Sequence, residues 1–84
     1  MEGTEHHRDV QTDIFVNETP VRLKENPLSG MDLKRAAIAQ GCPIDIRGRL
    51  FRMRGDRQIP VDDDQIIKCH EREHFRCISP DDNS

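Results

Sequence analysis

The chain has 84 residues, enough for one small domain. Only 33% of its residues are hydrophobic, tryptophan and tyrosine are absent, and charged residues reach 35%. Sixteen acidic residues against thirteen basic ones give a formal net charge of −3, so composition makes no general case for a nucleic-acid partner or an anionic membrane.

The cysteine count and the lack of a long apolar segment both bear on location. Cys42, Cys69 and Cys77 are an odd number, and neither an apolar leader nor a membrane-length stretch is visible. We therefore expect free thiols in a reducing cytoplasm. Each cysteine should then behave as a small, partly buried hydrophobe.

The ends of the chain differ from its middle. Residues 1–11 are polar and show no periodicity, so we expect a flexible tail there. The pair His6-His7 within it is only a weak, unselective metal signal. A single domain is expected over residues 12–79, followed by a flexible tail at residues 80–84.

A β-hairpin is predicted at the start of the domain. The first strand is predicted at residues 12–16, with an apolar run at residues 13–16. Residues 17–20 carry turn chemistry, and residues 21–23 alternate with a period of two. Because side chains alternate along a strand, Phe15 should face away from the core. The core-facing residues of the hairpin should be Ile14, Val16, Val21 and Leu23.

One short helix is predicted over residues 31–40, a stretch rich in helix formers. Ser29 is a good N-cap, and Asp32 follows three residues later, as in a capping box. Gly41 is a natural terminator. The stripe that packs against the sheet should contain Leu33 and Ala37, with Ala36 or Gln40 beside them.

Residues 50–54 are the next predicted strand, and alternation allows two registers. Either Phe51 and Met53 point inward with Leu50 outward, or Leu50 points inward together with Arg52. Burying an unpaired arginine is unfavourable, so the sequence favours the first register.

The remaining segments predict a turn, an edge strand, a helical turn and a last strand. Gly55-Asp56 is turn chemistry, and residues 59–61 form an edge strand, where proline is tolerated. A brief helical turn is expected at residues 65–68, above an apolar plug of Ile66 and Ile67. In the last strand, residues 74–78, two residues should face the core, Phe75 and Cys77, and three should face outward, His74, Arg76 and Ile78.

Hairpin, helix and further strands is the element order of a β-grasp domain, the fold of ubiquitin. The expected fold is therefore α+β and ubiquitin-like, a mixed four- to five-stranded sheet packed on one helix. Over about residues 12–80 the chain also resembles the prokaryotic multiubiquitin-domain family. The matching pieces are Phe15-Val16-Asn17, Pro20-Val21, Leu28-Ser29-Gly30 with Leu33-Lys34, Gly41-Cys42-Pro43, Leu50-Phe51-Arg52, Asp62-Asp63-Asp64, and His74-Phe75 to Pro80.

This resemblance implies a bacterial ubiquitin-like protein modifier, with antiviral defence as one setting. Relatives in the family lie beside proteins that resemble ubiquitin-activating enzymes, conjugating enzymes and deconjugating peptidases, which would be the partners here. The C-terminal carboxylate would be adenylated and conjugated to target proteins, and the chain itself would not be an enzyme. The conjugation tail would be Pro80, Asp81, Asp82, Asn83 and Ser84.

The tail departs from ubiquitin because it lacks Gly-Gly, which is thin and free enough to enter an enzyme cleft. Three alternatives follow. The activating enzyme has a differently shaped cleft, the tail is trimmed to Asn83 or a nearby residue, or the chain is not conjugated at all.

In ubiquitin, an apolar binding patch lies on the outer face of the third and last strands. Matching by order places a partner-binding surface here at Leu50 or Phe51, depending on the register, and at Ile78, with Arg76 beside them. The alternative function is therefore a non-conjugated ubiquitin-like interaction module that recruits a partner through this surface.

Other clusters give weaker signals. Cys69, His70, His74 and Cys77 offer zinc-type donors without a Cys-x-x-Cys pair, so a zinc-binding module is a third class and neither metal nor cofactor is expected. A catalytic Cys-His pair lacks a third orienting group.

Arginines outnumber lysines ten to three. Five of them form a basic stretch, which we expect to be a solvated strand face paired with Asp62 to Asp64. These five are Arg47, Arg49, Arg52, Arg54 and Arg57. The amines available for linking one modifier to another would be those of Lys24, Lys34 and Lys68.

Overall fold

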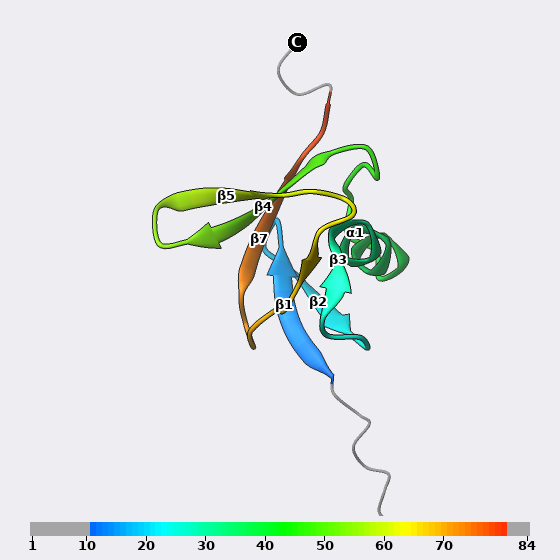
Figure 1. Ribbon diagram of the computed structural model, residues 1–84. Helices are drawn as coiled ribbons and strands as arrows, with labels where there is room; N and C mark the ends of the chain where they lie inside the picture. Colours follow the sequence, from blue (N-terminus) through cyan, green and yellow to red (C-terminus); the bar gives the residue numbers. More distant parts are fainter. Residues whose placement is uncertain (1–10, 81–84) are drawn as a thin grey trace, which may run out of the picture.

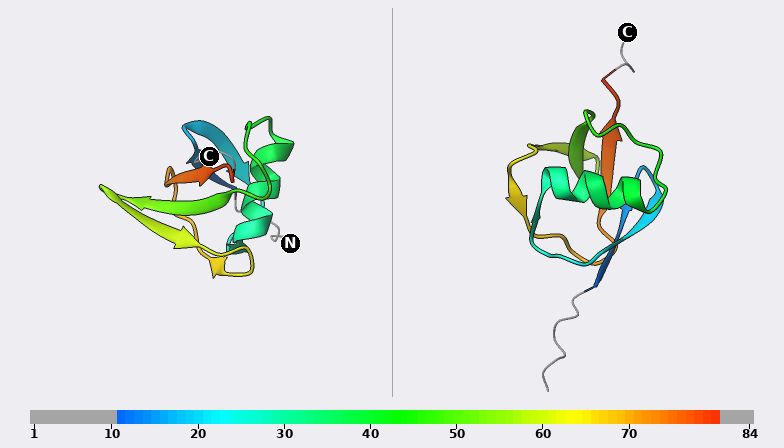
Figure 2. Two further views of the ribbon diagram at one scale, coloured as in Figure 1. Left: turned by 90° about the horizontal axis from the view of Figure 1, so that it is seen from above. Right: turned by 90° about the vertical axis from the view of Figure 1, so that its right-hand side faces the viewer.

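A computed structural model describes residues 11–80 of the chain. They form a mixed five-stranded sheet with one helix lying across one of its faces (Figures 1 and 2). This is a small α+β fold, as the sequence predicts. Of the tails predicted at residues 1–11 and 80–84, residues 1–10 and 81–84 lie outside the described residues.

The central strand of the sheet lies between two hairpins and runs parallel to one of its two neighbours. The elements are β1 (Thr12–Val16), β2 (Thr19–Leu23), β3 (Leu28–Ser29), α1 (Gly30–Ala39), β4 (Arg49–Arg54), β5 (Arg57–Val61), β6 (Ile66–Ile67) and β7 (His74–Ile78). The sheet has the order β2-β1-β7-β4-β5, with β1 and β7 parallel and all other neighbours antiparallel. The β4–β5 hairpin projects beyond the part of the sheet that α1 covers (Figure 1).

The first hairpin forms as predicted. Its loop is Asn17-Glu18, with φ of 50° and 67°. Two successive residues in the left-handed region make a turn whose twist matches that of the flanking strands. The four predicted core residues of the hairpin, Ile14, Val16, Val21 and Leu23, are all buried.

The helix also confirms its local signals. The Ser29 hydroxyl accepts a hydrogen bond from the Asp32 N–H at 3.0 Å, which satisfies one of the free donors of the first turn. Gly41 has φ of +93° and follows the helix end, a conformation that glycine adopts without strain. Leu33 and Ala37 are buried against the sheet.

Lys34 is the unexpected member of the buried helix face, with only 1% of its surface exposed. Its ammonium donates to the carbonyls of Ile46 and Gly48 at 2.7 and 2.8 Å, and it lies 2.8 Å from an Asp63 carboxylate oxygen. All three ammonium protons therefore have acceptors, which offsets the desolvation of the charge. The lysine ties α1 to the loop before β4 and to the acidic turn before β6.

The helical turn predicted at residues 65–68 is wrong. Ile66 and Ile67 form β6, which pairs with Leu28 and Ser29 of β3. Ile67 is buried while Ile66 is 65% exposed, so only one of the pair plugs the core. Short apolar runs do not distinguish strand from helix, and the partner strand has only two residues.

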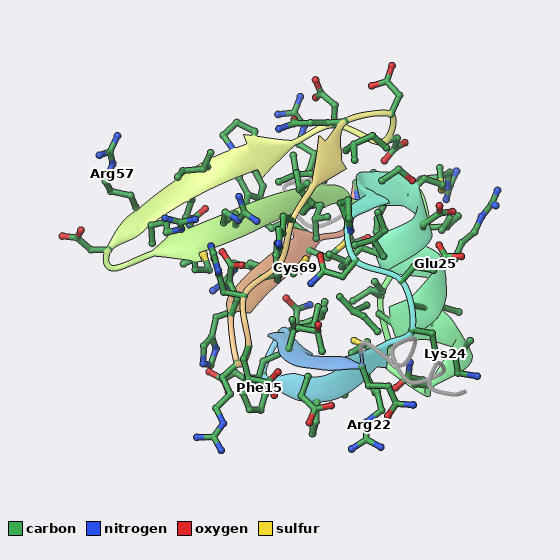
Figure 3. The ribbon with its side chains drawn as sticks, turned by 60° about the horizontal axis from the view of Figure 1, so that its bottom comes forward. Phe15, Arg22, Lys24, Glu25, Arg57 and Cys69 are labelled. Carbon is green, nitrogen blue, oxygen red and sulfur yellow. The ribbon has the colours of Figure 1, made fainter. Side chains whose placement is uncertain are left out.

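The three cysteines are free and buried, as expected of small hydrophobes. Burial raises the pKa of the Cys77 thiol, and it raises the pKa of Cys69 to about 11, with the nearby Glu73 carboxylate adding to the shift. Cys69 lies toward the middle of the domain (Figure 3). The Cys69 and Cys77 thiols are therefore mostly protonated at neutral pH and are poor nucleophiles.

Replacing Lys34 by methionine should strongly destabilise the domain. Methionine fills similar space but leaves two carbonyls and a half-exposed carboxylate without their donor, a loss of about 2–4 kcal/mol of unfolding free energy. Urea unfolding followed by circular dichroism measures this change.

Lys24→Met is the matched control, because Lys24 is exposed and its loss should change stability by less than about 0.5 kcal/mol. Equal effects of the two substitutions would show that the Lys34 contacts contribute nothing specific.

Candidate protein-interaction surface and chain exit

The register of β4 decides which side chains reach the outer face of the sheet. Leu50 lies opposite Val61 on one side and Cys77 on the other, and it is only 2% exposed. Leu50 and Arg52 therefore point toward the helix side, and Phe51 and Met53 point away from it. The register that the sequence favoured is wrong, and Leu50 is not part of the outer surface.

Arg52 points toward the helix side because its guanidinium has partners there. Its Nε lies 2.7 Å from a Glu73 carboxylate oxygen, and its Nη2 donates to the Lys68 carbonyl at 2.5 Å. The guanidinium also lies over the Phe75 ring, 5.7 Å from the centroid. The other Glu73 oxygen accepts the His70 N–H at 2.9 Å. A buried carboxylate thus holds the arginine inward.

We define the outer face as the side chains that point away from α1 on strands β1, β7, β4 and β5. On β4 and β7, Phe51 lies directly opposite Arg76, and Arg49 lies opposite Ile78. The Phe15 and His74 rings stack with centroids 4.7 Å apart. The outer face consists of Asp13, Phe15, Arg49, Phe51, Met53, Gln58, Pro60, His74, Arg76 and Ile78.

The outer face combines apolar side chains with positive charge. Its β4, β5 and β7 positions include Arg49 and Arg76 but no acid. A hollow runs along this face, lined by Met53, Arg72, His74, Arg76 and Ile78 together with the β1–β2 turn. Three of the four predicted surface residues thus come together, and Met53 joins them in place of Leu50.

Sequence reasoning missed Met53 because it placed this residue in the core. The available signal was Glu73, an acid immediately before the last strand. Once β7 pairs with β4, this acid meets Arg52.

The basic stretch pairs differently from the prediction. Arg52 and Arg54 both approach Glu73, the latter at 3.5 Å, and Arg47 approaches Asp45 at 3.4 Å. The Arg47 N–H donates to the Asp45 carboxylate and lowers its pKa. Of the acidic turn, Asp63 pairs with Lys34 instead. Arg57 points away from the body at the hairpin tip (Figure 3).

The chain leaves the sheet at the end of β7. Ser79 lines a second hollow with side chains of α1 and the following loop, including Ile38, Ile44 and Ile46. The next residue, Pro80, is exposed. It is the one described member of the predicted conjugation tail, since Asp81, Asp82, Asn83 and Ser84 lie outside the described residues.

No metal-ligand group emerges from residues 11–80, in which no three histidine, cysteine, aspartate or glutamate side chains are placed to hold an ion. Cys69 and Cys77 are buried, whereas His70 and His74 are exposed. Over the same residues, no helix has the length and apolar character needed to span a membrane.

Comparison with known proteins gives no relative, because no protein family, curated protein or solved structure matches this chain.

Glu73→Gln should destabilise the domain, because it removes the negative charge that compensates the buried side of Arg52. We expect a loss of about 2–3 kcal/mol of unfolding free energy, below the value for a fully buried pair since Arg52 keeps some exposure. Glu71→Gln, at an exposed position two residues earlier, should change stability by less than about 0.5 kcal/mol. Thermal unfolding of both variants measures these changes. An unchanged melting temperature for Glu73→Gln would show that Glu73 does not stabilise the inward position of Arg52.

Proposed function

We propose that the chain is a ubiquitin-like β-grasp protein of the multiubiquitin-domain family and acts in the bacterial cytoplasm as a protein modifier. The observation that carries this proposal is the sheet order, in which β7 lies between two hairpins, parallel to β1, and one helix crosses the sheet. Fold alone does not establish function, so the proposal also rests on the order of motifs along the chain.

The chemistry would take place on partner enzymes. A free carboxylate is a poor electrophile, so an activating enzyme would let the C-terminal carboxylate attack the α-phosphorus of ATP and release pyrophosphate. A thiol of that enzyme or of a conjugating enzyme would then displace AMP. Finally an amine of the target would displace the thiol, and a peptidase would reverse the linkage.

The place where the chain leaves the domain supports this role. β7 ends at Ile78, and Pro80 is already exposed, so the chain reaches solvent two residues beyond the end of the strand. A terminus that begins there enters an enzyme cleft without any strand being pulled from the sheet.

The structure also narrows the lysines that could accept a second modifier. Lys24 and Lys68 are exposed, whereas the Lys34 ammonium is buried and has three acceptors. Lys34 suits this role poorly, because its amine is buried and already bonded within the domain. Modifier-on-modifier linkage would use Lys24 or Lys68.

The proposal is tested by incubating the chain with ATP and an adenylating enzyme of the ubiquitin-activating class from the same genome. Intact mass spectrometry should show an adenylate or thioester at the C-terminal carboxylate. A chain that ends at Ser79 should give no adduct, while its melting temperature should change little because Pro80 is exposed.

Substitution of Lys24 by arginine is the control, because it should leave adenylation unchanged. If neither the full chain nor trimmed forms ending between Asp81 and Asn83 become activated, the modifier proposal fails.

The second candidate function is a non-conjugated interaction module, and the outer face favours it. Phe51, Met53 and Ile78 remain partly exposed on the strands that also carry Arg49 and Arg76. Apolar side chains flanked by cations suit a partner that presents apolar side chains flanked by carboxylates. The two candidates are compatible, because a conjugated modifier also needs a surface that its enzymes read.

Reversing one charge tests the role of the outer face. Arg76→Glu should weaken binding to the activating enzyme at least tenfold, about 1.4 kcal/mol, as measured by titration of the isotope-labelled chain. Arg57→Glu makes the same change of net charge at the hairpin tip and should weaken binding less than about twofold. Equal effects of both substitutions would show that binding follows net charge and not this surface.

A further inference from the structure

The backbone of β2 alternates between groups that pair with β1 and groups that point to the open edge. A two-residue loop places Val16 and Thr19 in a hydrogen-bonded pair, so the next pair, Phe15 with Pro20, is not hydrogen-bonded. The Phe15 N–H confirms this pairing pattern, because it points away from β2 and donates to the Glu73 carbonyl at 2.9 Å. The outward-pointing residues of β2 are therefore Pro20 and Arg22.

Neither outward position of β2 offers a free N–H to an added strand. Pro20 has no N–H to offer. The Arg22 N–H donates to the Gln40 side-chain oxygen at 2.8 Å, and the Arg22 carbonyl accepts from the Gln40 amide nitrogen at 2.7 Å. Gln40 is the C-cap residue of α1, so the helix places one amide group where a neighbouring strand would otherwise pair.

The opposite edge, β5, shows the same device. Gly55-Asp56 is the loop, so the pairs made by Arg57, Ile59 and Val61 with β4 are the hydrogen-bonded ones. The outward positions are Gln58 and Pro60. Because Pro60 lacks an N–H, Gln58 is the only one of these two that presents a donor along this edge.

We propose that neither edge of the sheet accepts an added strand, so that no partner binds this domain by extending its sheet. Strand addition needs a row of alternating donors and acceptors on an exposed edge. Here one edge keeps no free donor within β2 and the other keeps one. This inference goes beyond the proposed function, because it holds whether or not the chain is conjugated.

Opening the edges tests the proposal, with a second copy of the chain as the probe strand. The edge variants are Pro60→Val, which restores a donor on β5, and the double change Pro20→Val with Gln40→Ala, which frees β2. Pro43→Val is the matched control, since Pro43 is exposed in a loop outside every strand. Circular dichroism checks that each variant folds.

Sedimentation velocity should find the wild type and Pro43→Val monomeric, while the edge variants self-associate. Hydrogen exchange should then become slower at Gln58 or Arg22 on association. Edge variants that fold and stay monomeric would overturn the proposal, as would a wild-type dimer that protects the Gln58 amide.

A second measurement is independent of association. In dilute wild-type protein, the Arg22 amide should exchange at least tenfold more slowly than in Gln40→Ala. Equal exchange rates would show that Gln40 does not close this edge.

Discussion

A buried ion pair between Arg52 and Glu73 sets the composition of the surface on which the functional account depends. Because side chains alternate along a strand, holding Arg52 on the helix side also turns Leu50 inward and Phe51 and Met53 outward. Glu73 directly precedes β7, so the same contact fixes β4 against the strand that pairs with β1. An arginine that looks unfavourable in the core is thus the residue that selects the outer face.

Side-chain amides extend this use of polar groups in a domain with few apolar residues. Asn17, Asn26 and Gln40 each bond both the N–H and the carbonyl of one backbone residue, on Cys77, Cys69 and Arg22 respectively. Each amide takes the place of one residue of a neighbouring strand and satisfies two backbone groups. The short strands of this chain are thereby completed by side chains.

Local signals predicted the parts of the structure that local contacts determine. The first hairpin, the Ser29 cap, the Gly41 terminator and the alternation of β7 all follow from neighbours in the sequence. The β4 register, the burial of Lys34 and the β3–β6 pair depend on partners from 14 to 39 residues away, such as Glu73, Gly48 and Ile67. Single-sequence periodicity does not reveal such partners, so Leu50 was placed on the surface and Met53 in the core.

The central claim is that Phe51, Met53 and Ile78 face solvent while Leu50 faces the helix. Methyl-labelled protein with a soluble paramagnetic agent tests it directly, because the agent broadens the signals of exposed methyl groups. The account predicts strong broadening of the Met53 and Ile78 methyls and little broadening of the Leu50 methyls. Broadened Leu50 methyls beside protected Met53 would mean the opposite register and would contradict the account.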